Sequence, residues 1–511
     1  MSSTLPGGAT AESTRAYFVS HPLPHAPRYP RILGRTGLTV SPVGFGGYRV
    51  EDRDFHHREA LRKALTSGCN LIDTSANYTN GASEILMGQV IHELVAAGKI
   101  RREEIVVVTK AGYVQGDNLT LAQKRAENGQ PFADMVEYSE DCWHCIHPDY
   151  LSDQLTRSLG RLGLERVDAL LLHNPEYFLK TSNDHAEYYR RIRRAFEHLE
   201  QEADSGRIGW YGVSSNTFIV PREETDYTSL DTLVTIAREV AEARGKPSRF
   251  AVIQFPFNLL ESGAVLEENN TREDNRALSV LDLAREENLG TLANRPLNAF
   301  GPRGLMRLAT YPVRVIDVAA SALQEAFDEV LKHESAYPAQ ALGSAGIELP
   351  IQTVAWGHIL RQHFQRVATL EAWKSALRYQ VRPALEEAHV ELERAPEGKA
   401  WATRHRELCD RLFERVTETL QAKSNETADE IFMTLQGAVP ILGTSPTLSR
   451  MALRVYLAFP ALHCVLMGMR EPLYVNDALS LGPPLEAPQA LKALHAVQAN
   501  PPQHQHPHGH A

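Results

Sequence analysis

The sequence contains few cysteines and no long apolar run. Its five cysteines are an odd number scattered over 511 residues. That is not a disulfide framework, so we expect a reducing compartment, the cytoplasm. No apolar stretch approaches the roughly 20 residues that a membrane span requires, and we expect no membrane partner. Residues 1–29 lack the charged start and apolar core of a secretory signal and are rich in Pro, Ser and Thr. We expect a flexible arm there.

The chain also lacks an excess of positive charge. Lys and Arg number 53 against 63 Asp and Glu, which gives a formal net charge of −10. Nucleic-acid binding needs a basic surface, so we expect no nucleic-acid partner. The hydrophobic fraction of 43% is ample for a large core. The end, 481–511, carries the segment QHQHPHGHA and is predicted to be a flexible, His-rich tail.

What the chain does have is a repeated alternation of short apolar runs with amphipathic helical patterns. Continuous apolar runs such as IVVVTK and DALLLH are typical of parallel strands that are covered on both faces. Eight such runs occur, at 43–49, 70–75, 105–110, 168–173, 208–215, 249–255, 288–296 and 463–469. This number and alternation predict a closed parallel barrel or a doubly wound sheet.

The alternation stops in one long segment and then resumes. Helical patterns follow one another there without strand-like runs, which predicts an inserted all-helical subdomain after the seventh strand. A small hairpin, turning at Arg35-Thr36-Gly37, should precede the first strand. We expect the barrel to occupy 30–302 and 446–480, and the insertion to occupy 303–445. Connections after barrel strands lie on the catalytic face, so we expect the insertion to restrict access to the barrel mouth. An oligomerisation surface is the alternative.

Four ionisable side chains stand at or just beyond the ends of predicted strands. Asp73 closes NLID, Tyr78 follows five residues later, Lys110 closes VVVTK and His173 closes ALLLH. The carboxyl ends of parallel strands all face one mouth of a barrel. Burying four such groups for structure alone would be costly, so together they indicate a catalytic site. A metal-dependent barrel hydrolase would need strand-end His-x-His or carboxylate pairs, which are missing.

The motifs around these residues resemble the aldo-keto reductase family. The Asp-x4-Tyr spacing, the lysine in VVVTKAGY and the histidine in LLLHNPE match the family's tetrad. RTGLTVSPVGFGGYR, GRIGWYGVSSN and VIQFPFN match its other motifs. The resemblance covers the barrel and leaves out the insertion and both tails. It implies a (β/α)8 barrel and an NAD(P)H-dependent oxidoreductase that interconverts a small-molecule carbonyl (aldehyde, ketone or sugar) and an alcohol.

The resemblance also implies roles for the four residues. Tyr78 would be the general acid/base, Lys110 would lower the pKa of its phenol, and Asp73 would keep Lys110 charged. His173 would donate a hydrogen bond to the carbonyl oxygen. Some barrels of this family serve mainly as regulatory subunits, so a cofactor-sensing binding module with little turnover is the alternative function.

The family's cofactor contacts fall on a further set of residues. NADP is the predicted cofactor, with NAD the alternative, because Arg470 is well placed to meet a 2′-phosphate. Where the family often stacks an aromatic ring on the nicotinamide, this chain has Asn294 and Arg295. The predicted cofactor-binding residues are Gly46, Gly47, Ser214, Ser215, Asn216, Gln254, Pro296, Leu297, Gly468 and Arg470.

One motif has several possible meanings. CWHCIH places Cys142 and Cys145 in a Cys-x2-Cys pattern, but no second such pair exists in the sequence. Packing of a long loop that walls the substrate pocket, a metal site and a redox-sensitive thiol pair all stay open. In the insertion, Trp356 and Trp373 are expected to pack in a helical core. His358 and His363 have no spacing that suggests a metal, and we predict no metal site.

Overall fold

A computed structural model describes most of the chain and divides it into two compact units. The first unit is Met1–Pro296 with Arg450–His495, and the second is Leu297–Ser449 with Ala496–Ala511. The described residues are 4–25, 28–272, 274–301, 304–311, 320–367 and 369–502. Each unit is described by itself below.

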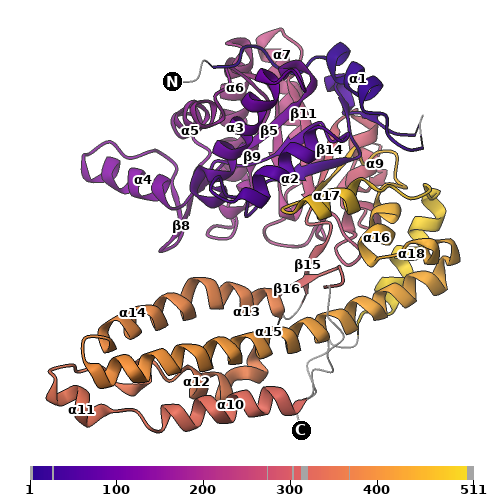
Figure 1. Cartoon of the computed structure of the whole chain (residues 1–511). Coiled ribbons are helices and arrows are strands. Elements are labelled where there is room, and N and C mark those ends of the chain that lie inside the picture. The colour runs from indigo at the N-terminus through magenta and orange to yellow at the C-terminus, as the bar shows by residue number, and fades with distance from the viewer. Residues whose placement is uncertain are drawn as a thin grey trace. The chain divides into compact units, whose positions relative to one another are not determined.

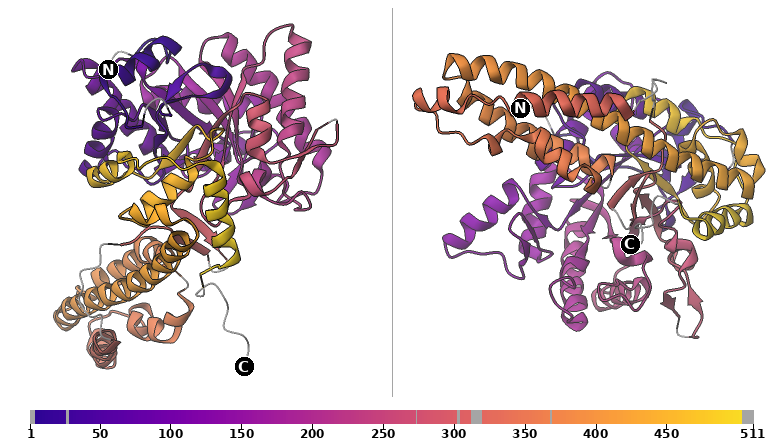
Figure 2. Two further views of the ribbon diagram at one scale, coloured as in Figure 1. Left: turned by 90° about the vertical axis from the view of Figure 1, so that its right-hand side faces the viewer. Right: turned by 90° about the horizontal axis from the view of Figure 1, so that it is seen from below.

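The first unit is built on a closed barrel of eight parallel strands (Figure 1). Helices follow the strands along the chain and lie around them (Figure 2). The strands, in barrel order, are β10 (Ile208–Ser214), β11 (Phe250–Pro256), β14 (Gly290–Asn294), β17 (Cys464–Met467), β3 (Val43–Gly46), β4 (Leu71–Asp73), β5 (Val106–Ala111) and β9 (Val167–His173). The predicted (β/α)8 barrel is confirmed, and each of the eight apolar runs supplies one strand.

The barrel strands are apolar along their length because both faces are covered. All residues of β5, β9 and β11 are buried, as expected for strands that have side chains inside the barrel and helices outside. The register pairs Gly46 with Asp73 and Lys110 with Leu171. This alignment brings the carboxyl ends of β3, β4, β5 and β9 to one face.

The helices of this unit show ordinary start and stop signals. In α5 (Pro148–Leu162), Pro148 begins the helix and Gly163 ends it with a left-handed φ of 63°. Leu151 and Leu155 are buried at helical spacing. The other helices are α2 (Phe55–Leu65), α3 (Ala82–Ala96), α6 (His185–Asp204), α7 (Leu230–Arg244), α8 (Gly263–Leu266), α9 (Val280–Glu286), α16 (Leu448–Tyr456) and α17 (Pro472–Leu479).

The predicted opening hairpin is present. Strand β1 (Arg31–Ile32) pairs antiparallel with β2 (Thr39–Val40). Gly37 adopts a φ of 71° in the connection, which a side chain would disfavour. A second short pair, β12 (Asn270–Thr271) with β13 (Ala277–Leu278), precedes α9.

The prediction of a flexible arm at 1–29 is wrong for its central part. Residues Ala11–Ser20 form the helix α1, which is capped by the side chain of Thr10. Tyr17 is fully buried, and its hydroxyl donates to the backbone oxygen of Leu65 at 2.9 Å. Thr14 and Phe18 are buried as well, so three side chains fix this segment although its composition resembles that of a disordered arm.

The flexible tail predicted at 481–511 is also wrong in part. Residues Ala487–Ala499 form α18, and Ala490 and Leu494 are buried on one side of it. A short run of Ala and Leu four residues apart is enough for an apolar helix face. The histidine-rich segment 503–511 lies outside the described residues.

The long connection after β5 has structure of its own. A small antiparallel sheet has the strand order β6 (Tyr113–Val114), β8 (Cys142–His144) and β7 (Val136–Ser139). The helix α4 (Asp117–Glu127) lies between β6 and β7 in the chain. Phe132 and Cys145 share a core with Val114, Ala122 and Tyr150.

The second unit is mainly helical, as predicted. Its core includes Trp373, with Trp356 packed against it. One expectation was wrong, since Asn298–Gly301 (β15) pairs antiparallel with Gly304–Arg307 (β16) where no strand was predicted. The helices are α10 (Ala320–Glu334), α11 (Ala339–Ser344), α12 (Trp356–His363), α13 (Leu370–Ala376), α14 (Arg382–Leu392) and α15 (Pro396–Ala438). In the part of the chain that the structure describes, no helix combines the length and apolar character of a membrane span.

Candidate active site

The four predicted catalytic side chains meet at the carboxyl-terminal face of the barrel. Asp73, Lys110 and His173 lie at the ends of β4, β5 and β9. Tyr78 begins a short turn, Tyr78–Gly81, in which Thr79 has a φ of 48°. A left-handed β-branched residue is strained, so the surrounding structure must hold this turn in place beside the tyrosine.

Lys110 is the centre of the group. Its Nζ donates to Asp73 Oδ2 at 2.7 Å, to the backbone oxygen of Thr74 at 2.8 Å and to the Tyr78 hydroxyl at 3.4 Å. The side chain of Lys110 is fully buried. Three acceptors satisfy the three ammonium protons, so the lysine can stay charged without water.

A series of hydrogen-bonded side chains supports the second carboxylate oxygen of Asp73. Gln254 Nε2 donates to Asp73 Oδ1 at 2.8 Å. The oxygen of the same amide accepts from Ser214 Oγ at 3.0 Å and from Asn294 Nδ2 at 3.3 Å. Two residues that were predicted to meet the cofactor, Ser214 and Gln254, are thereby joined to the catalytic group.

Burial opposes both charges of the central ion pair. It raises the pKa of Asp73 above its ordinary value, against the attraction of Lys110 and the hydrogen bonds from Lys110 and Gln254. It lowers the pKa of Lys110, against the attraction of Asp73. Each group needs the other to stay ionised in this buried setting, so removal of either would leave a costly unpaired charge.

The expected lowering of the Tyr78 pKa by Lys110 does not dominate in this structure. Burial, the negative charge of Asp73 and the neighbouring Tyr48 raise the pKa of the Tyr78 phenol well above its ordinary value. The ammonium lies 3.4 Å from the hydroxyl, but Asp73 neutralises it at 2.7 Å. The resting phenol therefore holds its proton firmly.

His173 is a neutral imidazole beside the phenol. Its ring centroid lies 5.8 Å from that of Tyr78 in an edge arrangement. Burial and the positive charge of Lys110 lower the pKa of His173 well below its ordinary value. Its Nδ1 lies 3.0 Å from the hydroxyl of Ser75, a partner that the sequence analysis missed.

The CWHCIH motif contributes a support for His173. His144 Nε2 lies 2.7 Å from the backbone oxygen of His173, and burial lowers the pKa of His144 to about 4. Cys142 and Cys145 are both buried free thiols, and Cys145 Sγ lies 3.4 Å from the backbone oxygen of Ala133. These contacts favour the packing interpretation of the motif.

A second polar group surrounds Asn216. Its backbone nitrogen donates to Glu176 Oε1 at 2.9 Å, and its side-chain oxygen accepts from Arg295 Nη1 at 3.2 Å. Glu176 is almost fully buried, and burial raises its pKa to about 7. Ser215 caps the turn that begins at Asn216. Sequence reasoning missed Glu176, although it stands three residues after the strand-end histidine.

The remaining predicted cofactor residues are dispersed around this face. Gly46 ends β3, and Gly47 has room for no side chain, since a Cβ would meet Ser83 Oγ at 2.5 Å. Gly468 and Arg470 follow β17, and Arg470 is half-buried without an ion pair to any described residue. Pro296 is the last residue of the first unit before the insertion, and Leu297 belongs to the second unit. Their cofactor roles stay predictions.

Two buried oxygens in this region lack a partner among the described residues. These are Asn294 Oδ1 and Glu176 Oε2. A buried acceptor without a donor is unfavourable, which favours a ligand that supplies N–H groups. A carboxamide, such as that of a nicotinamide, carries two such protons. The side chains present therefore fit this cofactor class.

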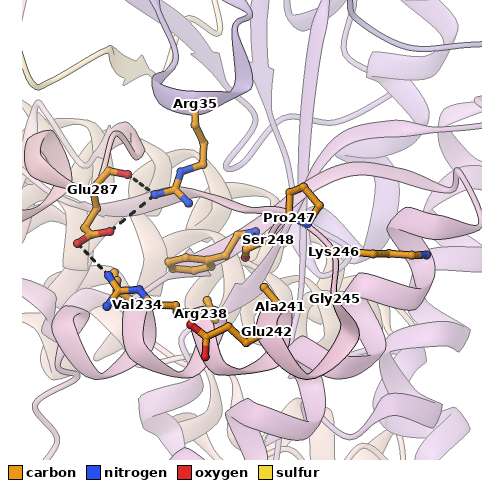
Figure 3. Close-up of a pocket in the computed structure, with 12 residues that line it drawn as sticks. Arg35, Val234, Arg238, Ala241, Glu242, Gly245, Lys246, Pro247, Ser248 and Glu287 are labelled. Atoms are coloured by element: carbon orange, nitrogen blue, oxygen red, sulfur yellow. Dashed lines mark hydrogen bonds and ion pairs between the residues drawn. The ribbon is translucent and has the colours of Figure 1, made fainter.

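A pocket of about 360 Å³ lies elsewhere on the first unit and includes Phe250, the residue that begins β11 (Figure 3). Glu287 pairs there with Arg35 at 3.8 Å and with Arg238 at 3.5 Å. None of the four catalytic candidates lines it. In such barrels the amino-terminal ends of the strands serve stability, so we assign no chemistry to this pocket.

The comparison with known families agrees with the site. The aldo/keto reductase family matches residues 42–301, about half of the chain. The chain belongs to the aldo/keto reductase family. The matched segment contains all four catalytic candidates and seven barrel strands.

Curated relatives of this aldo/keto reductase are distant. A Schizosaccharomyces pombe protein, assigned by name to the beta subunits of voltage-gated potassium channels, is 30% identical over 36% of this chain and 44% of its own length. The NADH-specific methylglyoxal reductase of Escherichia coli is 27% identical over 28% of this chain and 40% of its own length. The chain spans about half the length of the curated relatives it matches.

Among solved structures, the glycerol dehydrogenase of Gluconobacter oxydans is similar to this chain. The match has a TM-score of 0.46 and 17% identity, and it covers 93% of this chain and 96% of that one. This similarity is too low to carry an argument about the chain.

Proposed function

We propose that this protein is a nicotinamide-dependent oxidoreductase that interconverts a carbonyl and an alcohol, with Tyr78 as general acid/base. The observation that carries the proposal is the placement of Lys110 Nζ, which donates both to Asp73 at 2.7 Å and to the Tyr78 hydroxyl at 3.4 Å. These groups lie at the face of the barrel where enzymes of this fold carry their active sites.

Tyr78 supplies the proton in the direction of reduction. Its raised pKa means that the phenol is fully protonated at neutral pH, ready to protonate the oxygen of a carbonyl. The phenolate that forms is stabilised by the hydrogen bond from Lys110. The lysine thus acts mainly on the transition state, where charge develops, rather than on the resting phenol.

Asp73 and Gln254 hold Lys110 in position. The carboxylate accepts from Lys110 through one oxygen and from the Gln254 amide through the other. Neither group needs to touch substrate. Their role is to keep the ammonium charged and directed toward the phenol.

His173 orients the substrate oxygen. In the structure the Ser75 hydroxyl donates to Asn77 Oδ1 at 2.7 Å. The proposal requires this hydroxyl to turn and donate to Nδ1 of His173 at 3.0 Å, so that Nε2 keeps its own proton and donates to the carbonyl oxygen. The low pKa of His173 keeps the ring neutral, so it orients the carbonyl without competing with Tyr78 as the acid.

Side chains next to the catalytic group would hold the cofactor. Asn294, Ser214 and Asn216 would meet the carboxamide, and Arg470 would meet a 2′-phosphate, which makes NADP the proposed cofactor and NAD the alternative. When bound, the nicotinamide supplies or accepts the hydride. Gly46, Gly47, Ser215, Pro296, Leu297 and Gly468 complete the proposed cofactor site.

The test is to incubate the purified full chain with NADPH or NADH and a panel of aldehydes, ketones and sugars. Loss of reduced cofactor with equimolar alcohol formation supports the proposal. Cofactor binding without turnover of any compound, in either direction of the reaction, would contradict it.

A cofactor-sensing binding module is the second candidate. It is favoured by relatives that carry the name of potassium channel beta subunits. On that hypothesis the chain binds NADPH tightly and reduces carbonyl compounds slowly. Replacement of Tyr78 then has little effect on its binding function.

A further inference from the structure

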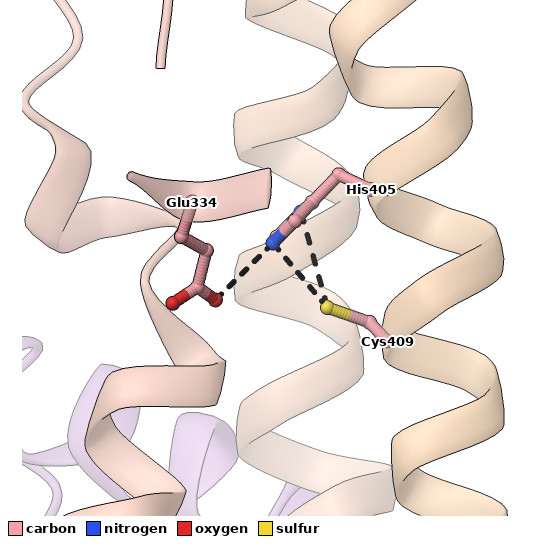
Figure 4. Close-up of side chains that lie close together, drawn as sticks. All are labelled: Glu334, His405 and Cys409. Atoms are coloured by element: carbon pink, nitrogen blue, oxygen red, sulfur yellow. Dashed lines mark hydrogen bonds and ion pairs between the residues drawn. The ribbon is translucent and has the colours of Figure 1, made fainter. Parts of the chain in front are cut away.

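A cluster of buried metal-ligating side chains lies in the helical unit, apart from the candidate active site. Glu334 is the last residue of α10, and His405 and Cys409 lie one turn apart on α15. All three are buried, and their ligand atoms lie within 4.8 Å of one another. Figure 4 shows the carboxylate of Glu334 directed toward one ring nitrogen of His405, and the sulfur of Cys409 in contact with both ring nitrogens.

Two separations are close to those between neighbouring ligands of a tetrahedral zinc ion. His405 Nε2 lies 3.3 Å from Glu334 Oε1 and 3.4 Å from Cys409 Sγ. Sγ also lies 3.9 Å from His405 Nδ1, so it lies beside the ring, and metal binding requires the Cys409 side chain to turn toward the lone pair of Nε2. Zinc bonds of ordinary length at tetrahedral angles place nitrogen and oxygen ligands about 3.3 Å apart, and nitrogen and sulfur ligands about 3.6 Å apart. The spacing of four residues on a helix puts His405 and Cys409 on one face.

Hydrogen bonding alone leaves this cluster incompletely satisfied. His405 Nε2 carries either one proton or one lone pair, yet the carboxylate and the thiol lie 3.3 Å and 3.4 Å from it. If Nε2 carries a proton, it donates that proton mainly to Glu334, and its hydrogen bond to the buried Cys409 sulfur is weak. A cation between the three atoms would satisfy the nitrogen, the oxygen and the sulfur together.

The surroundings orient the three side chains as a metal site requires. His405 Nδ1 lies 3.0 Å from His389 Nε2, which fixes the ring and its tautomer. Trp401 stacks on the His405 ring at 4.4 Å. The outer carboxylate oxygen, Glu334 Oε2, lies 2.5 Å from His358 Nδ1, which leaves Oε1 directed at His405.

Electrostatics favour a dication at this place. Glu334 is a buried carboxylate that accepts hydrogen bonds from the backbone nitrogens of Gly357 at 2.7 Å and His358 at 3.1 Å as well as facing two imidazoles. A divalent ion with one carboxylate and one thiolate is formally neutral, which removes the cost of that buried charge.

We propose that Glu334, His405 and Cys409 bind a divalent transition-metal ion of the zinc class, with the fourth position open to water or another ligand. Borderline ions of this class accept mixed oxygen, nitrogen and sulfur ligands. Burial raises the pKa of the Cys409 thiol, so binding replaces its proton by the metal and releases that proton to solvent.

Cobalt(II) tests the proposal, because a cobalt–thiolate bond gives an intense near-ultraviolet charge-transfer band. We expect the metal-free full chain to bind one Co²⁺ with this band, and Zn²⁺ to remove it by competition. Cys409→Ser should abolish the band. The matched control is Cys142→Ser, which removes the Cys-x2-Cys pair and should leave the band unchanged. The histidine-rich end has no thiol and cannot produce it.

A band that disappears in Cys142→Ser and persists in Cys409→Ser would overturn the proposal, and so would the absence of any band in the unaltered protein. His389→Ala adds a graded test, since loss of a ligand-orienting partner typically weakens metal affinity by about 10–100-fold. If the Cys409 variant does not fold, thermal unfolding of the unaltered chain decides. Zn²⁺ should raise its midpoint and Mg²⁺ should not, whereas equal effects would overturn the proposal.

Discussion

At the scale of single residues, burial rather than charge sets the properties of the catalytic candidates. Lys110 forms an ion pair with Asp73 at 2.7 Å, and burial together with the charge of Asp73 raises the pKa of the Tyr78 phenol. On the proposed function, the Tyr78 phenol keeps its proton until negative charge develops on the carbonyl oxygen of the substrate. Residue type and order in the sequence cannot reveal this balance, because it depends on distances between three strand ends.

On the proposed function, Arg470 selects NADPH over NADH. Arg470→Ala should weaken NADPH binding by about 1–3 kcal/mol, the range for a lost charge-assisted hydrogen bond, and leave NADH binding almost unchanged. Arg450→Ala is the matched control, because Arg450 Nε forms an ion pair with Asp477 at 2.7 Å. Titration of both cofactors by fluorescence measures the effect. Equal losses for NADPH and NADH in Arg470→Ala would contradict the role.

Glu176 should make stability depend on pH. Its folded pKa of about 7 lies above the ordinary value of 4.5. Its contribution to stability is therefore complete below pH 4.5 and is lost as pH rises through 7, by about 3 kcal/mol. Glu176→Gln should become more stable relative to the unaltered chain over this range. Denaturant unfolding at several pH values measures the free energy of unfolding of both proteins, and Glu197→Gln, at an exposed position, is the control. If the difference between Glu176→Gln and the unaltered chain does not change with pH, the prediction is refuted.

The four catalytic candidates could be predicted because they are ionisable residues at the ends of apolar runs. Their neighbours could not. Ser75, His144 and Glu176 are ordinary polar residues in the sequence, and only the folded barrel places them against His173 and Asn216. The metal-site candidates Glu334 and His405 are 71 positions apart and were missed for the same reason.

At the scale of elements, periodic apolar patterns predicted the barrel strands well and the chain ends poorly. Each barrel strand has a continuous apolar run, whereas the buried side chains of α1 are Thr14, Tyr17 and Phe18. So few buried positions leave no periodic apolar pattern to detect. The connection that holds Cys142–His144 was likewise expected to be one long loop, because two- to four-residue strands are too short for a period to show.

The anchoring of α1 can be tested by one substitution. Tyr17→Ala should lower the free energy of unfolding by about 3–5 kcal/mol, as for other buried aromatic residues. Val19→Ala on the same helix is the control, because Val19 is 82% exposed and should change stability by less than about 0.5 kcal/mol. Chemical denaturation measures both. Equal stability of the two variants would support a flexible arm instead.

At the scale of the whole molecule, the chain combines a catalytic barrel with a helical unit that has its own core. The insertion follows β14, whose carboxyl end belongs to the face that carries the tetrad. That the helical unit restricts access to the mouth stays a prediction, with an oligomerisation surface as the alternative. The proposed metal site would give this unit a stabilising element independent of the barrel.

The most direct test of the central claim is single-turnover reduction of an accepted carbonyl substrate by NADPH, measured for Tyr78→Phe and for the unaltered chain. The account predicts that the substitution slows reduction by at least about 100-fold, the lower range for a lost general acid. NADPH affinity should be nearly unchanged. Tyr379→Phe, which changes an exposed phenol of the helical unit, should retain the rate of the unaltered chain. An undiminished rate in Tyr78→Phe would contradict the account.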